Sequence, residues 1–167
     1  MQTNQPRKAT SQTTRINGKR VVIRTSAKGK VSVADAPIKE IEGQAAQVRA
    51  LRSLPEYGRQ FLLAGDMNSA KRGPRAQADA IATGMTPGEA DLRIYLKGGK
   101  MRMIENKAGK GRLSPAQVDR HASLARLGHP VEVVRFTSTA EATSKAVALV
   151  KGWLADNDNS KQREEGE

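Results

Sequence analysis

The sequence predicts an α/β fold in which helices flank a small mixed β-sheet, with a β-hairpin extension before this core. Segments rich in β-branched residues alternate with segments whose apolar residues recur at spacings of three and four, which is the order expected of α/β proteins. Glycine-containing turns separate two pairs of the predicted strands, as in β-hairpins. The length of 167 residues fits one domain with a substantial hydrophobic core.

The chain carries 29 Lys and Arg residues against 17 Asp and Glu, a formal net charge of +12. This excess argues for a polyanionic partner, and DNA is the leading candidate. No apolar run approaches the roughly 18 residues of a membrane span, and no signal-peptide or lipidation pattern follows Met1, so we expect a cytoplasmic protein with no membrane partner. Because the chain has no Cys and two His, any metal would be held mainly by oxygen.

The composition divides the chain into four parts. Residues 1–18 are predicted to be a disordered basic arm, since they contain basic and small polar residues and no acid. Residues 19–36 are predicted to form an accessory hairpin, which either packs on the main domain or contacts DNA. Residues 37–154 are assigned to the main domain, and the acidic residues 155–167, which lack apolar anchors, are expected to be disordered.

The first element of the main domain is a helix predicted over residues 38–53. Pro37 suits a helix start, and apolar residues follow at helical spacing, namely Ile38, Ile41, Ala45 and Val48. Glu42 lies at the border of this apolar stripe, where its carboxylate could lean toward the neighbouring sheet. Glu40 is the competing glutamate, on a more exposed face of the same helix.

A short strand over residues 59–64 and a helix over residues 74–83 are predicted next, the helix ending at Gly84. Between them lies a basic cluster, which we interpret as contacting phosphate groups, with a merely solvated loop as the alternative. Its members are Lys71, Arg72 and Arg75.

A hairpin over residues 91–107 carries the charged residues that matter most for function. Its two strands flank Gly98-Gly99, a turn signal. Side chains alternate along a strand, so Glu105 and Lys107 share one face while Asn106 points to the other. Asn106 then faces a core helix and needs a hydrogen-bond partner there.

The length of the hairpin loop decides which side chains meet. A two-residue loop pairs Asp91 with Asn106, whereas the three-residue loop 97–99 pairs Asp91 with Glu105 and places Lys107 on the same face. A metal site requires the longer loop, and two oxygen ligands with open positions suit Mg²⁺ or Mn²⁺. Lys107 could orient the attacking water. The alternative is a surface hairpin whose Glu and Lys form an exposed pair.

The chain after the hairpin begins with a flexible basic loop that could follow a nucleic-acid backbone through Lys110 and Arg112. Ser114, Pro115 and Gln117 then form a capping-box pattern, which predicts a helix ending near residues 127–128. His121 on this helix is interpreted as structural. A strand follows Pro130, and a last helix is predicted from a cap at Ser138 to Leu154.

Four blocks occur in a fixed order: Gly-Met-Thr-Pro-Gly-Glu-Ala-Asp (residues 84–91), Ile-Glu-Asn-Lys (104–107), Gly-Arg-Leu-Ser-Pro-Ala-Gln (111–117) and Leu-Gly-His-Pro-Val-Glu-Val-Val (127–134). This order resembles the VRR-NUC family of the PD-(D/E)XK nuclease superfamily, in particular its small stand-alone phage and bacterial type. The resemblance covers residues 42–153. Two positions depart from the family pattern: Ala90 replaces a proline, and Asn106 replaces an apolar residue.

The resemblance implies a restriction-endonuclease-like core and metal-dependent cleavage of DNA that leaves a 5′-phosphate. It implies that Asp91, Glu105, the Asn106 carbonyl and Glu42 bind Mg²⁺ or Mn²⁺, while Lys107 and Gln117 position the water. Gln117 therefore has two possible roles, as a capping residue and as a site residue. Asn68 matches a family asparagine after the strand. A homodimer and a branched or structured DNA substrate are further implications.

Two other functions remain open at this point. A noncatalytic DNA-binding or assembly protein would keep the fold and charge but carry a degraded site. An RNA-binding protein is the other alternative, although the two Phe, two Tyr and one Trp of the chain provide few rings for base stacking.

Overall fold

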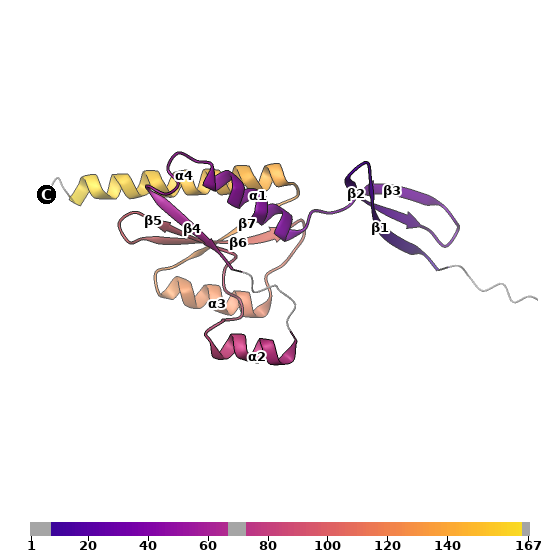
Figure 1. Cartoon of the computed structure of the whole chain (residues 1–167), viewed down its shortest axis with the longest axis horizontal. Coiled ribbons are helices and arrows are strands. Elements are labelled where there is room, and N and C mark those ends of the chain that lie inside the picture. Colours follow the sequence, from indigo (N-terminus) through magenta and orange to yellow (C-terminus); the bar gives the residue numbers. More distant parts are fainter. Residues whose placement is uncertain (1–7, 67–72, 165–167) are drawn as a thin grey trace, which may run out of the picture. The chain divides into compact units, whose positions relative to one another are not determined.

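The computed structural model describes residues 8–66 and 73–164. The chain forms two compact units, one from residues 1–37 and one from residues 38–167. Each unit has its own β-sheet (Figure 1). No helix of the described residues is both long and apolar enough to cross a lipid bilayer.

The N-terminal unit is a three-stranded antiparallel sheet rather than the predicted hairpin. The strands are β1 (Thr10–Ile16), β2 (Lys19–Thr25) and β3 (Val31–Asp35), in the order β1-β2-β3. The predicted hairpin corresponds to β2 and β3, but β1 lies in the segment predicted to be a disordered arm, so that prediction is wrong for residues 10–16. The overlooked signal is Asn17-Gly18, whose positive φ angles of 50° and 76° are those of a tight hairpin turn.

The C-terminal unit contains a mixed sheet of four strands in the order β4-β5-β6-β7. They are β4 (Phe61–Gly65), β5 (Leu92–Leu96), β6 (Met101–Ala108) and β7 (Val131–Phe136). Strand β5 is antiparallel to both of its neighbours, β4 and β6, and β7 runs parallel to β6. Helix α3 (Pro115–Arg126) makes the crossover between β6 and β7, as a parallel pair requires. The predicted α/β fold with a mixed sheet is confirmed.

Helices cover both faces of this sheet (Figure 1). On one face, α1 (Glu40–Arg52) and α4 (Thr139–Glu164) bury the main core with the even-numbered residues of β5 and β6 and the end of β7. On the other face, Leu124 of α3 packs with Met103 and Ala90. Helix α2 (Pro74–Ala82) lies beyond α3 and buries none of its residues. The two faces therefore differ, since the odd-numbered residues of β6 point toward α3.

Helix α4 continues through residues predicted to be a disordered tail. It was expected to end near Leu154, but it extends to Glu164, so the tail prediction is wrong for residues 155–164. The side chain of Asn157 is buried, and its Nδ2 donates to the Lys97 carbonyl oxygen at 2.7 Å. This hydrogen bond links the extension to the loop between β5 and β6. Residues 165–167 lie outside the described part of the chain.

Asn106 has the buried partner that its position requires. Its side chain points into the main core, where the Gln47 Nε2 of α1 donates to the Asn106 Oδ1 at 2.8 Å. Both side chains are completely buried. Two amides thus occupy a layer that is otherwise apolar. Their hydrogen bond offsets part of the cost of burying them, while the Gln47 Oε1 and the Asn106 Nδ2 stay buried without a hydrogen-bond partner.

Replacing Gln47 with Leu should destabilise the protein by about 1 to 3 kcal/mol, because the Asn106 Oδ1 would lose its donor inside the core. Urea denaturation measures the loss. The double variant Gln47→Leu/Asn106→Leu is the control: with both polar groups removed, most of the lost stability should return. A single variant as stable as the wild type would show that the pair makes no net contribution.

Candidate active site

The hairpin between β5 and β6 has the longer of the two possible loops. Leu92 pairs with Ile104 and Tyr95 with Met101, and the Leu96 N–H donates to the Lys100 carbonyl at 2.8 Å. Three residues, 97–99, therefore form the loop, with φ of 90° at Gly98 and 80° at Gly99. One step beyond Leu92 in this register, Asp91 lies opposite Glu105. The three-residue loop expected of a metal site is confirmed.

This register also brings the two carboxylates close together. Hydrogen-bonded and non-hydrogen-bonded pairs alternate along an antiparallel ladder. Since Leu96 and Lys100 exchange a hydrogen bond, the position of Asp91 and Glu105 is a non-hydrogen-bonded one. At such positions the Cα atoms approach to about 4.5 Å, closer than at the neighbouring pairs.

Asp91 is held from several directions at the end of β5. Its Oδ2 accepts the Asn106 N–H at 2.7 Å. Its own carbonyl oxygen accepts from the Gln44 Nε2 at 3.1 Å and from the Asp66 N–H at 2.8 Å. Burial, and then the nearby Glu105 charge, raise the pKa of Asp91 from 3.8 to about 6 despite the bond from Asn106. The metal-free site therefore resists full ionisation.

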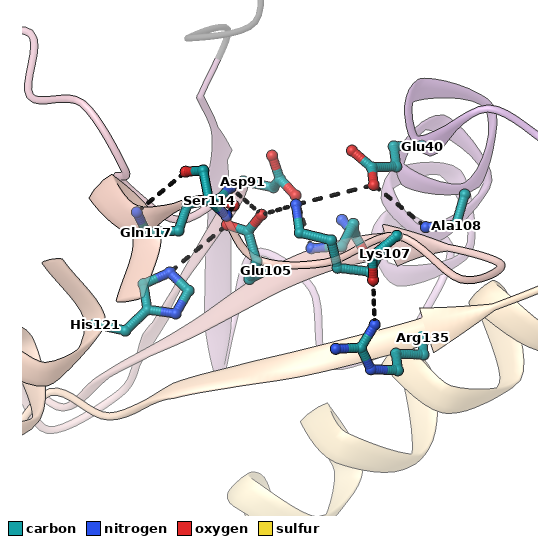
Figure 2. A network of polar contacts seen from close by, with 11 residues as sticks. Glu40, Asp91, Glu105, Lys107, Ala108, Ser114, Gln117, His121 and Arg135 are labelled. Atoms are coloured by element: carbon teal, nitrogen blue, oxygen red, sulfur yellow. Dashed lines mark hydrogen bonds and ion pairs between the residues drawn. The ribbon is translucent and has the colours of Figure 1, made fainter. Parts of the chain in front are cut away.

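Glu105 lies at the centre of the group shown in Figure 2, and only 1% of its surface is exposed. Its Oε1 accepts from the Lys107 Nζ at 2.7 Å and from the Gln117 Nε2 at 2.5 Å. Its Oε2 is buried and has no hydrogen-bond partner. Burial raises the pKa of Glu105, and the Lys107 ammonium opposes this shift.

His121 faces the unpartnered oxygen of Glu105. Its Nε2, also buried without a hydrogen-bond partner, lies 3.7 Å from the Glu105 Oε2 (Figure 2). Burial, reinforced by the Lys107 charge, lowers the pKa of His121 and favours the neutral imidazole. The interpretation of His121 as purely structural missed this contact, although its spacing of four residues from Gln117 places both on one side of α3.

Lys107 is 5% exposed and meets a glutamate of α1, but this residue is Glu40 rather than Glu42. The Glu40 Oε1 lies 3.8 Å from the Lys107 Nζ and accepts the Ala108 N–H at 3.3 Å. The Glu42 Oε2 instead accepts the Lys39 N–H at 2.9 Å, at the start of the helix. The placement predicted for Glu42 is therefore wrong, because capping α1 draws its carboxylate away from the sheet.

Gln117 closes the predicted capping box and also contacts Glu105. Its Oε1 accepts the Ser114 N–H at 2.9 Å, and its backbone N–H donates to the Ser114 Oγ at 3.2 Å. Its Nε2 remains available and donates to Glu105. A primary amide has a donor end and an acceptor end, so one side chain closes the capping box and contacts the site.

The turn before Asp91 packs directly on the first turn of α3. A Cβ at Gly88, where φ is +82°, would lie 2.3 Å from the Ala116 carbonyl oxygen and 2.9 Å from the Gln117 nitrogen. Beside it, the Glu89 Oε2 accepts two bonds from the Arg120 guanidinium, at 2.9 and 2.7 Å. Glu89 is therefore a structural link between this turn and α3.

Three of the six residues proposed to contact DNA lie in the described part of the chain. Lys110 and Arg112 are exposed in the loop after β6, and Arg75 is exposed in the first turn of α2. The Arg135 Nη1 donates to the Gly111 carbonyl at 2.5 Å and tethers the loop between Lys110 and Arg112. The other predicted contacts, Asn68, Lys71 and Arg72, lie outside the described residues.

The oxygen atoms at this end of the hairpin have the chemistry of ligands for a divalent cation. Among residues 8–66 and 73–164, no three Asp, Glu, His or Cys side chains are grouped as a ready-made metal cage. Mg²⁺, however, is usually held by one or two carboxylates and water. The Glu105 Oε2 is a buried oxygen without a partner, and Asp91 lies opposite it. The Asn106 N–H points to Asp91, so its carbonyl points to the same side of the strand. These oxygens fit a hard cation.

Comparison with solved structures gave one match. No protein-family model matches the chain, and no curated protein matches it. A solved structure described as a "VRR_NUC domain protein" aligns with a TM-score of 0.48 and 22% sequence identity, covering 68% of this chain and 89% of that chain.

Proposed function

We propose that this protein is a metal-dependent nuclease that hydrolyses phosphodiester bonds in DNA. The observation that carries the proposal is the convergence of Asp91, Glu105 and Lys107 on one face of the hairpin, with Lys107 bonded to Glu105 at 2.7 Å. A buried carboxylate and a half-buried one beside a buried ammonium are costly to fold, and the raised pKa of Asp91 reflects that cost. Such perturbed groups are typical of functional sites.

Asp91, Glu105 and the Asn106 carbonyl would hold Mg²⁺ or Mn²⁺. Of the two Glu105 oxygens, Oε2 is the better placed to bind the ion. The Oε1 already accepts hydrogen bonds from Lys107 and Gln117, so its lone pairs are in use, whereas those of Oε2 are available. Glu40 takes the place first assigned to Glu42, near Lys107 and with an oxygen 3.8 Å from its Nζ. When bound, such a cation lowers the pKa of a coordinated water and offsets charge on the phosphate.

The protein side chains orient these groups. Lys107 keeps the Glu105 Oε1 in place and presents an ammonium that can orient the attacking water and offset negative charge developing on the phosphate. Gln117 fixes the same oxygen from the opposite helix. His121 limits the space around Oε2 on the side of α3. The carboxylate is thus restrained on both oxygens before any substrate arrives, which lowers the entropy cost of reaching a reactive geometry.

The substrate is inferred from charge. A net charge of +12 favours a polyanion, and the exposed Lys110 and Arg112 lie in the loop that follows Lys107. A 5′-phosphate product, branched or structured DNA as substrate, and a homodimer are extensions of this proposal that come from the family resemblance of the four sequence blocks.

The test is cleavage of supercoiled, linear, single-stranded and four-way-junction DNA by the purified protein, with Mg²⁺, Mn²⁺ or EDTA. We expect cleavage of at least one substrate with a divalent cation and none in EDTA. Tight DNA binding without cleavage under any of these conditions would instead support a noncatalytic DNA-binding protein.

Lys110→Glu/Arg112→Glu should weaken DNA binding and reduce its salt dependence. If each residue neutralises one phosphate, the slope of log K against log salt should flatten by about 1.8. Fluorescence anisotropy in EDTA measures binding without cleavage, and Arg75→Glu reports whether α2 belongs to the same track. An unchanged slope in the double variant would move the DNA contact to the N-terminal unit.

A further inference from the structure

One aromatic ring of the C-terminal unit is open to solvent. The chain has two Phe, two Tyr and one Trp, and all five lie in the described part of the chain. Phe61 and Phe136 are buried. Tyr57 packs edge-on against Phe61, and Trp153 packs against the main core. Tyr95, in contrast, is 44% exposed and is the ring most accessible to a ligand.

Tyr95 belongs to an apolar row that crosses the sheet. It pairs with Leu62 of β4 and with Met101 of β6, and paired residues in a sheet share a face. Leu62 is 53% exposed and lies on an edge strand. The contact between Tyr95 and Leu62 stabilises the sheet by itself, so a ligand is indicated only if the surroundings of the ring are suited to one.

Those surroundings form a hollow of about 250 Å³ beside the ring. Of the described residues that line it, two are basic, Arg59 and Lys97, and none is acidic. The Arg59 guanidinium donates to the Pro55 carbonyl from Nε at 3.1 Å and from Nη2 at 2.6 Å, which directs the group while using two of its five N–H donors. An aromatic face beside two cations is typical of sites for single-stranded nucleic acid.

The same side of β5 leads from this hollow to the candidate active site. Side chains alternate along a strand, so Tyr95, Arg93 and Asp91 point to one side. Tyr95 is four positions from Asp91, roughly 13 Å at about 3.3 Å per residue. Between them, Arg93 is paired with the Asp66 carboxylate at 2.9 Å. One DNA strand can therefore contact both the Tyr95 ring and the carboxylate end of the hairpin.

We propose that Tyr95 stacks on an unpaired base of the DNA substrate, while Arg59 and Lys97 contact the adjoining phosphates. Stacking on a side chain requires a base whose face is accessible, which a base inside a duplex does not offer. The site thus takes a single-stranded segment of DNA near the cleaved bond. The proposal rests on the proposed nuclease function, since it assumes the same DNA substrate.

Two substitutions at one position separate the ring from the strand that carries it. Tyr95→Val removes the ring but keeps a residue suited to a strand, whereas Tyr95→Phe keeps the ring and is the matched control. Binding of the full chain to oligothymidine and to a duplex is measured in EDTA by fluorescence anisotropy. We expect Tyr95→Val to raise Kd for oligothymidine about fivefold or more, as for one lost stacking contact, and Kd for the duplex less than about twofold. Tyr95→Phe should change either Kd less than about twofold.

Two further measurements locate the base and the phosphate. An oligonucleotide that carries 5-iodouracil is crosslinked to the protein by light and digested with trypsin, which cleaves after Arg93 and Lys97. The crosslink is expected on the peptide of residues 94–97, which contains Tyr95. Lys97→Ala should flatten the slope of log K against log salt for oligothymidine by about 0.7, the value for one phosphate of a single strand.

Equal weakening of single-strand and duplex binding by Tyr95→Val, unchanged single-strand binding, or a crosslink confined to other peptides would overturn the proposal. Tighter binding of oligouridine than of oligothymidine would overturn it too, because RNA would then be the ligand. Circular dichroism checks that the variants keep their fold. Cleavage by the wild type with Mg²⁺ is assayed separately, so an inactive protein that still binds single strands through Tyr95 would contradict the nuclease function and not this site.

Discussion

Asp91→Asn and Glu105→Gln are each expected to lower DNA cleavage by about 10³-fold or more, because each removes a charge that would hold the cation activating the water. Asn at position 91 keeps an oxygen that can accept the Asn106 N–H, so the backbone around the site should persist. DNA binding in EDTA should change little, since the basic residues proposed to contact phosphate lie elsewhere. Single-turnover cleavage with Mn²⁺ measures the loss. Full activity in both variants would refute the mechanism.

The same Asp91→Asn variant should be more stable than the wild type when no metal is present. The folded-state pKa of Asp91 is raised from 3.8 to about 6, so ionised Asp91 opposes folding. This cost is absent below about pH 4, grows between pH 4 and 6, and is complete above pH 6. After allowance for partial solvent exposure we expect a gain of about 1 to 2 kcal/mol at pH 8. Urea denaturation in EDTA at pH 4 and pH 8 tests the difference.

Gln117→Glu is expected to lower cleavage about 10²-fold while leaving the helix cap largely intact. A carboxylate oxygen can still accept the Ser114 N–H, but the donor that now lies 2.5 Å from the Glu105 Oε1 would be replaced by a second negative oxygen. This variant thereby separates the contribution of Gln117 to the helix cap from its contribution to the position of Glu105. Cleavage rates and melting temperatures of the folded protein provide the two readouts.

Ser114→Ala is the matched control for Gln117. It removes the Oγ that accepts the Gln117 N–H and should cost about 0.5 to 2 kcal/mol, the value of a lost N-cap, with normal cleavage. Gln117→Ala should show both defects, since it loses the acceptor for Ser114 and the donor for Glu105. Wild-type cleavage by Gln117→Glu would reduce Gln117 to a capping residue.

Much of the C-terminal unit could be predicted from local patterns. The start of α3 follows from Ser114 and Pro115, and the hairpin loop was chosen correctly because only the three-residue form brings Asp91 to Glu105. The need for a core partner at Asn106 also followed from alternation alone. The helix start and the alternation depend on a few consecutive residues, so sequence spacing determines them, whereas the loop length followed only from the requirement that Asp91 meet Glu105. The identity of the partner, Gln47, depends on how α1 lies over the sheet, which spacing cannot give.

The failed predictions have different physical causes. Strand β1 is built largely from threonine and other polar residues, so it lacks the apolar alternation by which strands are recognised. The helical pattern favoured Glu42, at the border of the apolar stripe, over Glu40, but the pattern does not show that the Glu42 carboxylate bonds to the Lys39 N–H at the start of α1. In the α4 extension, Asn157 donates to the carbonyl of Lys97, sixty residues away in sequence, and local patterns cannot predict such a contact.

The contact at Gly88 has a consequence for how the site moves. Because no side chain separates this turn from the carbonyl of Ala116, and Arg120 clamps the adjacent Glu89, a shift of the first turn of α3 must displace the turn as well. Asp91 and Gln117 belong to elements far apart in sequence but should respond to a displacement together. In amide hydrogen exchange, the turn and the start of α3 should therefore open as one cooperative unit, and filling the space at Gly88 with alanine should make both exchange faster.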